Sequence, residues 1–136
     1  MGVFMRTTLL LFLTLTAWGC GSYSKQQQMT QPGIVPVVAA IMPPSQFHGG
    51  SQFTLMVMGS SFNANAVVNW NAVAQSNTTH PTANMLSVTI PAADIANPGT
   101  VQISVTNPGS STPGGPYGGG SNTPSETSGS VTFTIN

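Results

Sequence analysis

The side chains that could take part in chemistry are few and far apart in this 136-residue chain. It holds one cysteine, two histidines, two basic and two acidic residues. A catalytic or metal site needs several such groups within reach of one another. His48 and His80 fall in predicted loops at opposite ends of the domain, with no Cys, Asp or Glu beside either. We therefore expect no catalytic, metal-binding or cofactor-binding residue, and no enzyme.

Ser45, His48 and Asp94 are the one combination with the residue types of a nucleophile, a base and an orienting acid. His48 and Asp94 are expected at the same end of the domain, with Ser45 nearby. A triad also needs a buried and oriented histidine, whereas histidines in loops are usually solvated. We interpret these three as surface residues.

The single cysteine, Cys20, follows a segment typical of export. Arg6 precedes an apolar run over residues 7–18, and Gly19 stands directly before the cysteine. A basic start, a short apolar core and a small residue are the parts of a signal peptide. The apolar run is shorter than the ~20 residues of a membrane-spanning helix. Residues 1–19 are therefore predicted to be a signal peptide.

The junction Gly19-Cys20-Gly21 resembles the lipobox of bacterial lipoproteins, although Trp18 is larger than the residue usual there. In that family the cysteine is lipidated and becomes the new N-terminus. The resemblance, with Gly21 after the cysteine, implies a lipoprotein anchored in the outer membrane through Cys20. The alternative is an ordinary signal peptide and a free thiol, which is uncommon in exported proteins. Residues 20–36, rich in Gln, Ser, Gly and Pro, are predicted to be a flexible tether.

Residues 37–136 are predicted to form one small domain. After residue 19 only Lys25, Asp94 and Glu126 are charged, and a nucleic-acid partner would require a basic face. Apolar residues alternate with Ser, Thr or Gln in several short runs, as in strands with one wet face. Seven short runs, of which 86–90, 101–106 and 131–135 alternate cleanly, predict an all-β sandwich of two sheets; they cover residues 37–41, 53–59, 67–70, 72–75, 86–90, 101–106 and 131–135.

Four segments, in order, resemble the IPT/TIG family of immunoglobulin-like domains. They are the opening Ile41-Met-Pro-Pro-Ser45, the run 53–62 with Gly59 shortly before Phe62, Val67-Val-Asn-Trp-Asn71, and a fourth segment made of 86–95 followed by 99–108. The resemblance covers most of residues 37–136 and implies an immunoglobulin-like fold. The chain departs from the family at residues 108–129, a long stretch of Gly, Ser, Pro and Thr that we expect to be a loop without secondary structure, either functional or disordered.

Two aromatic residues are candidates for ligand contact. Tyr117 lies in the long loop, where an exposed tyrosine could serve as a contact residue or lie in a disordered segment. Trp70 could be a ligand platform, but such a position faces the core of immunoglobulin-like sandwiches. We therefore expect a non-catalytic, membrane-anchored surface lipoprotein that acts as a binding or spacer module in protein interaction or adhesion. The alternative is a carbohydrate-binding accessory lipoprotein of a polysaccharide-handling system.

Overall fold

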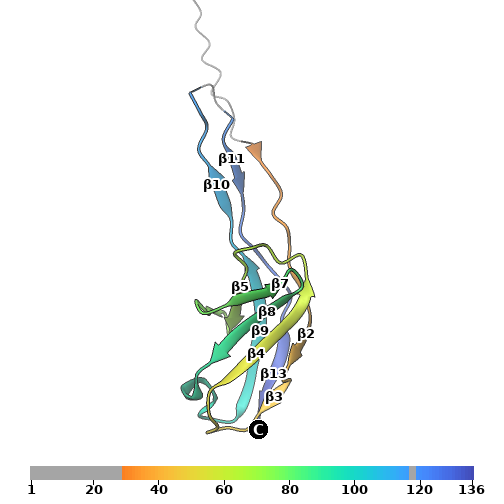
Figure 1. The fold of residues 1–136 in the computed structure, drawn as a ribbon, viewed down its shortest axis with the longest axis vertical. Helices are drawn as coiled ribbons and strands as arrows, with labels where there is room; N and C mark the ends of the chain where they lie inside the picture. The colour runs from red at the N-terminus through yellow and green to blue at the C-terminus, as the bar shows by residue number, and fades with distance from the viewer. Residues whose placement is uncertain (1–28, 117–118) are drawn as a thin grey trace, which may run out of the picture.

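The computed structural model describes residues 29–116 and 119–136, and this part of the chain is almost entirely β structure (Figure 1). The one helical element in these residues is a short 3-10 turn, Ala92–Ile95. No helix within the described ranges is long and apolar enough to cross a membrane.

Two sheets form an immunoglobulin-like sandwich, as predicted. The first has the strand order β2-β4-β8-β7, and the second has the order β3-β13-β9-β5-β6, with β12 also paired to β9. Of the seven main strands (β2, β4, β5, β7, β8, β9 and β13), the first, second, fourth and fifth thus share one sheet, as in immunoglobulin domains. The bounds are β2 Val37–Met42, β3 Ser45–Gln46, β4 Phe53–Ser60, β5 Val67–Trp70, β6 Val73–Ala74, β7 Thr79–Thr82, β8 Met85–Ile90, β9 Gly99–Asn107, β12 Glu126–Thr127 and β13 Val131–Ile135.

The chain changes sheets at Pro43 and Pro44. Strand β2 pairs antiparallel with β4, whereas β3 pairs parallel with β13, where Ser45 lies opposite Thr134. The two prolines lack the N–H groups that would continue the β2 ladder. Strand β2 therefore ends at Met42, directly before the proline pair and one residue beyond the predicted run 37–41.

The core lies between the two sheets and consists of the inward residues of the alternating runs. Leu55, Val88, Ile103 and Phe133 are fully buried, and Trp70 is only 6% exposed. The alternation in β4, β8, β9 and β13 thus placed the apolar face correctly. The tryptophan belongs to the core, as predicted.

Gly59 is needed because its neighbours leave no space for a side chain, and not because the chain makes a tight bend at this residue. The positive φ of this turn is at Ser61 (61°) and not at the glycine. A Cβ at residue 59 would collide with the carbonyl of Val37 and with the ring of Phe62. Glycine here lets β2 and the partly buried Phe62 approach the backbone of β4.

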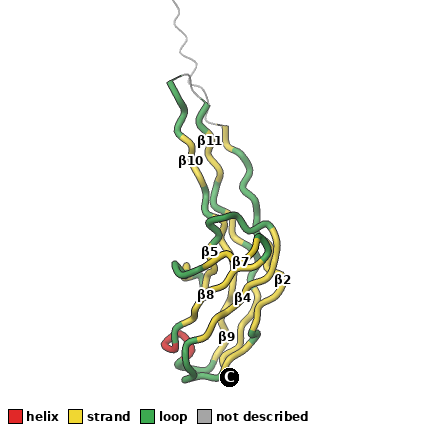
Figure 2. The backbone as a smooth tube through the Cα atoms, in the orientation of Figure 1, coloured by secondary structure: helices red, strands yellow, loops and turns green. Residues whose placement is uncertain are grey.

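The prediction of an unstructured loop over residues 108–129 is wrong. Strands β10 (Ser110–Thr112) and β11 (Ser121–Thr123) form an antiparallel hairpin, and β1 (Met29–Thr30) pairs parallel with β11. This three-stranded sheet, which we call the arm, extends beyond one end of the sandwich along its long axis (Figures 1 and 2). Strands β9 and β13 pair with each other and so bring the two ends of residues 108–129 together. Strand pairing therefore continues outward into the arm, although the arm has no apolar core.

Candidate functional site

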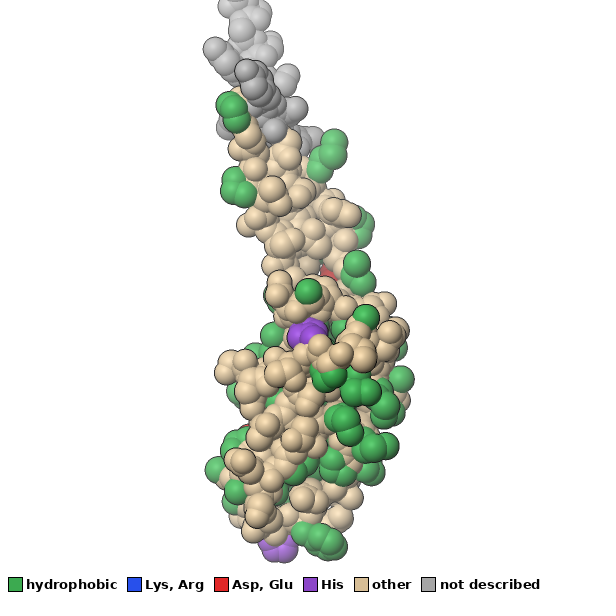
Figure 3. Space-filling view, viewed as in Figure 1, with side chains coloured by type: hydrophobic (Ala, Val, Ile, Leu, Met, Phe, Trp, Pro, Cys, Tyr) green, Lys and Arg blue, Asp and Glu red, His purple; other side chains and the backbone are tan. Residues whose placement is uncertain are grey.

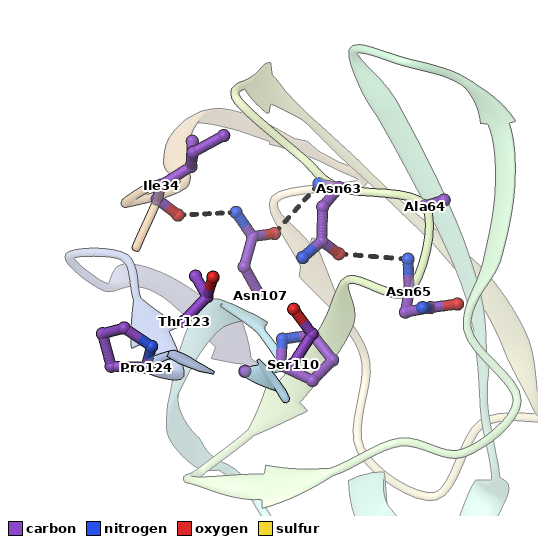
Figure 4. A pocket seen from close by; sticks show the side chains of 10 residues that line it. Ile34, Asn63, Ala64, Asn65, Asn107, Ser110, Thr123 and Pro124 are labelled. Atoms are coloured by element: carbon purple, nitrogen blue, oxygen red, sulfur yellow. Dashed lines mark hydrogen bonds between the residues drawn. The ribbon is translucent and has the colours of Figure 1, made fainter. Parts of the chain in front are cut away.

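A cleft of about 310 Å³ lies where the arm joins the sandwich (Figure 4). Three separate parts of the chain meet there: the segment before β2, the turn between β4 and β5, and the two strands that lead into the arm. The cleft is lined by Ile34, Asn63, Ala64, Asn65, Asn107, Pro108, Gly109, Ser110, Thr123 and Pro124.

Asn107 connects these parts through its side-chain amide. Its Nδ2 donates to the carbonyl of Ile34 at 2.7 Å and to the carbonyl of Ser61 at 2.8 Å. Its Oδ1 accepts from the backbone N–H of Asn63 at 3.0 Å. Figure 4 shows the amide between Ile34 and Asn63. The side chain is 3% exposed, so these bonds replace the water that a buried amide would lose.

Our sequence prediction did not include Asn107, although the pattern contains a signal for it. Val101, Ile103 and Val105 face the core, and the next position of the same alternation is Asn107. A polar residue at an inward position must find hydrogen-bond partners in the protein. Those partners come from segments 46 and 73 residues away in the sequence, which the pattern alone does not identify.

The predicted tether, residues 20–36, is described only from Met29 onward, and there it is ordered and not a flexible linker. The N–H of Gln31 donates to the carbonyl of Asn122 at 3.0 Å. Gly33 lies against the side chain of Glu126, at a distance that leaves no room for a Cβ. Pro36 is fully buried. The chain before β2 therefore runs along the arm and is fixed to it at several points.

The chemistry available in the cleft is neutral hydrogen bonding and apolar contact. None of the residues that line it is charged or a histidine, and the side-chain hydrogen bonds of Asn107 are directed to the protein itself. Figure 3 shows the same character over one whole face, where apolar and neutral polar surface predominates.

His48 and His80 lie at opposite ends of the sandwich, as predicted, although His80 belongs to strand β7 and not to a loop. The Nδ1 of His48 is 2.7 Å from the carbonyl of Asn136, just beyond β13. The Nε2 of His80 is 3.0 Å from the carbonyl of Ala66, just before β5. The two ends are separated by the length of β9, roughly 25 Å for a strand of this size. Within the described ranges no group of three potential metal ligands occurs.

Asp94 and His48 share one end of the sandwich, because the N–H of Gly49 donates to the carbonyl of Ile95 at 2.8 Å. Both side chains are exposed. The histidine ring is hydrogen-bonded to the main-chain oxygen of Asn136. The arrangement agrees with our interpretation of His48 and Asp94 as surface residues, whereas Ser45 is half-buried in β3.

Cys20 and Tyr117, the two site residues predicted from the sequence, lie outside the described residues. Trp70, the candidate platform, is buried against Phe133. Among the described aromatic side chains, Phe47 is the one large ring that is mostly exposed, at 75%.

A scan against protein-family models gives no match, and a search of curated proteins gives none either.

Proposed function

We propose that this protein is a non-catalytic lipoprotein of the outer membrane, anchored through Cys20, that carries one IPT/TIG-type immunoglobulin-like domain. The domain acts as a spacer or binding module in protein interaction or adhesion. The observation that carries the proposal is the arm, on which the N-terminal segment runs outward from the sandwich. The segment that leads back to Cys20 therefore leaves from the far end of the arm.

The nearly uncharged composition supports this proposal. Lys25, Asp94 and Glu126 are the only charged residues after residue 19. Such a surface favours association over solubility as a free monomer, and it offers little to a nucleic acid. A module held at a membrane and surrounded by other envelope components suits this composition.

The carbohydrate-binding alternative has less support. Stacking against a sugar ring requires an exposed aromatic platform, and Trp70 is buried in the core. Phe47 is exposed, but it lines neither the cleft at the base of the arm nor the cleft beside His80. The spacer and protein-binding function is therefore the one that we propose.

Replacement of the cysteine tests the proposal directly. The wild-type chain should be found in the membrane fraction with an acylated N-terminal Cys20, and Cys20→Ser should be released into the soluble fraction. The measurement is cell fractionation with intact-mass analysis of the mature N-terminus. Ser24→Ala, a change in the same segment, is the control and should leave membrane association unchanged. A soluble wild-type chain without acyl mass would contradict the proposal.

A further inference from the structure

We propose that the arm is a stalk that sets the orientation of the sandwich on a lipid surface. The far end of the arm faces the bilayer, and the opposite end of the sandwich, with Phe47 and the C-terminal Asn136, faces away from it. This inference rests on the proposed anchorage at Cys20 and adds a defined geometry to it.

The path of the chain leads from the far end of the arm to the sandwich. Met29 lies opposite Ser121 and Thr30 opposite Asn122, at the part of the arm distant from the sandwich (Figure 1). From there the chain descends along the arm, through Gln31 and Gly33, to the buried Pro36. The anchored cysteine therefore joins the domain at the far end of the arm and not at the sandwich.

The segment between the anchor and the arm has a short reach. Nine Cα-to-Cα steps separate Cys20 from Met29, and they span at most about 32 Å when fully extended. The ladder from Thr112 to Gly99 covers roughly 40 Å in extended strands. The connection is thus too short for the sandwich to stand upright with its Gly99 end on the bilayer.

The junction between arm and sandwich is held by several bonds. Strand β12 pairs with β9 at the base of the arm, where Glu126 lies opposite Asn107. Asn107 joins Ile34 and Ser61 through its amide, and Ser125 Oγ donates to the carbonyl of Asn107 at 3.3 Å. Backbone pairing and buried hydrogen bonds from several segments oppose bending at this junction.

The orientation can be measured because an acylated Cys20 leaves no free thiol, so an introduced cysteine is the only site for a label. Ser111→Cys places a fluorophore on β10, and Ser51→Cys places it in the exposed loop before β4 at the other end. The acylated chains are reconstituted in phosphatidylethanolamine–phosphatidylglycerol vesicles that carry an acceptor dye on the headgroups. Energy transfer should be several-fold higher from residue 111 than from residue 51. Equal transfer from the two sites would overturn the stalk.

Gln31 provides the matched pair of variants. Gln31→Pro removes the N–H that donates to Asn122 and should reduce the difference in transfer between the two labels, whereas Gln31→Ala keeps this N–H and should preserve the difference. An undiminished difference in Gln31→Pro would contradict the role of this pairing.

A chain without acyl mass on Cys20 would overturn the lipoprotein proposal together with the orientation. Equal energy transfer from an acylated chain would overturn the orientation alone.

The rigidity of the stalk has a test that does not depend on lipid. In a Cys20→Ser background, spin labels on Ser51→Cys and Ser111→Cys should give a narrow distance distribution centred near ~40 Å, as extended strands predict. A broad distribution in the folded chain would overturn the stalk even where Cys20 is acylated.

Discussion

The indole of Trp70 packs on the ring of Phe133, with ring centroids 5.2 Å apart and the ring planes inclined by 53°. Phe133 in turn stacks on Phe53 at 5.5 Å and 14°. The three rings come from β5, β13 and β4, and so from both sheets. Aromatic contacts of this geometry contribute beyond the apolar area that they bury, and they join the two sheets at the centre of the sandwich.

Trp70→Ala should lower the free energy of unfolding by ~3–5 kcal/mol, because it leaves a cavity beside Phe133. Trp70→Phe is the control and should cost less, since it keeps a ring in the core. Trp70 is the only tryptophan after residue 18, so its fluorescence reports this site alone. The emission of the mature chain should be blue-shifted and resistant to acrylamide. Red, freely quenched emission from a folded sample would contradict the core assignment.

Asn107→Asp should destabilise the chain by ~1–3 kcal/mol. The carboxylate has the shape of the amide but no N–H to donate, and it would face the carbonyl oxygens of Ile34 and Ser61. Denaturant unfolding at neutral pH measures the loss. Asn65→Asp is the matched control, because Asn65 is exposed and contributes its backbone N–H to the nearby hydrogen bond. Equal stability of the two variants would show that the Asn107 amide does not hold the junction.

Gly59→Ala should cost ~1–3 kcal/mol, the usual penalty of overpacking. The added methyl group would meet the carbonyl of Val37 and the ring of Phe62, which must both shift. Gly129→Ala is the control, since a methyl group added there would meet open space and the φ of this residue is not in the left-handed region. Thermal melts of the two variants should differ by several degrees. A stable Gly59→Ala chain would mean that β2 moves away from β4 without cost.

Replacement of residues 110–123 by Asn-Gly should leave the sandwich almost as stable as in the full chain. The side chains of β10 are exposed, and those of β11 are exposed or half-buried, so the arm contributes little apolar burial. Asn-Gly favours a two-residue hairpin turn. Denaturant unfolding of the shortened chain provides the measurement. A large loss of stability would show that the arm packs on the sandwich more extensively than its exposure indicates.

The sequence by itself determined the sandwich. Alternation with a period of two in runs such as 101–105 and 131–135 decides which side chains leave water, and the burial of apolar area is the main force that holds two sheets together. The same signal placed Phe133 in the core, and the position of Trp70 in the predicted sandwich placed the tryptophan there. The end of β2 at Pro43 was predictable for a local reason, because proline has no N–H to continue a ladder.

Only the tertiary structure decided the arm and its junction. Residues 108–129 and 29–36 have few large apolar side chains and no clear alternation, so a sequence pattern based on burial predicts a loop and a flexible linker. Their order comes from backbone hydrogen bonds between distant segments, such as Gln31 to Asn122, and from the amide of Asn107. Backbone donors and acceptors are the same in every residue except proline. Which strands pair with each other is therefore decided by where the neighbouring strands lie in space. Those positions exist only in the folded chain.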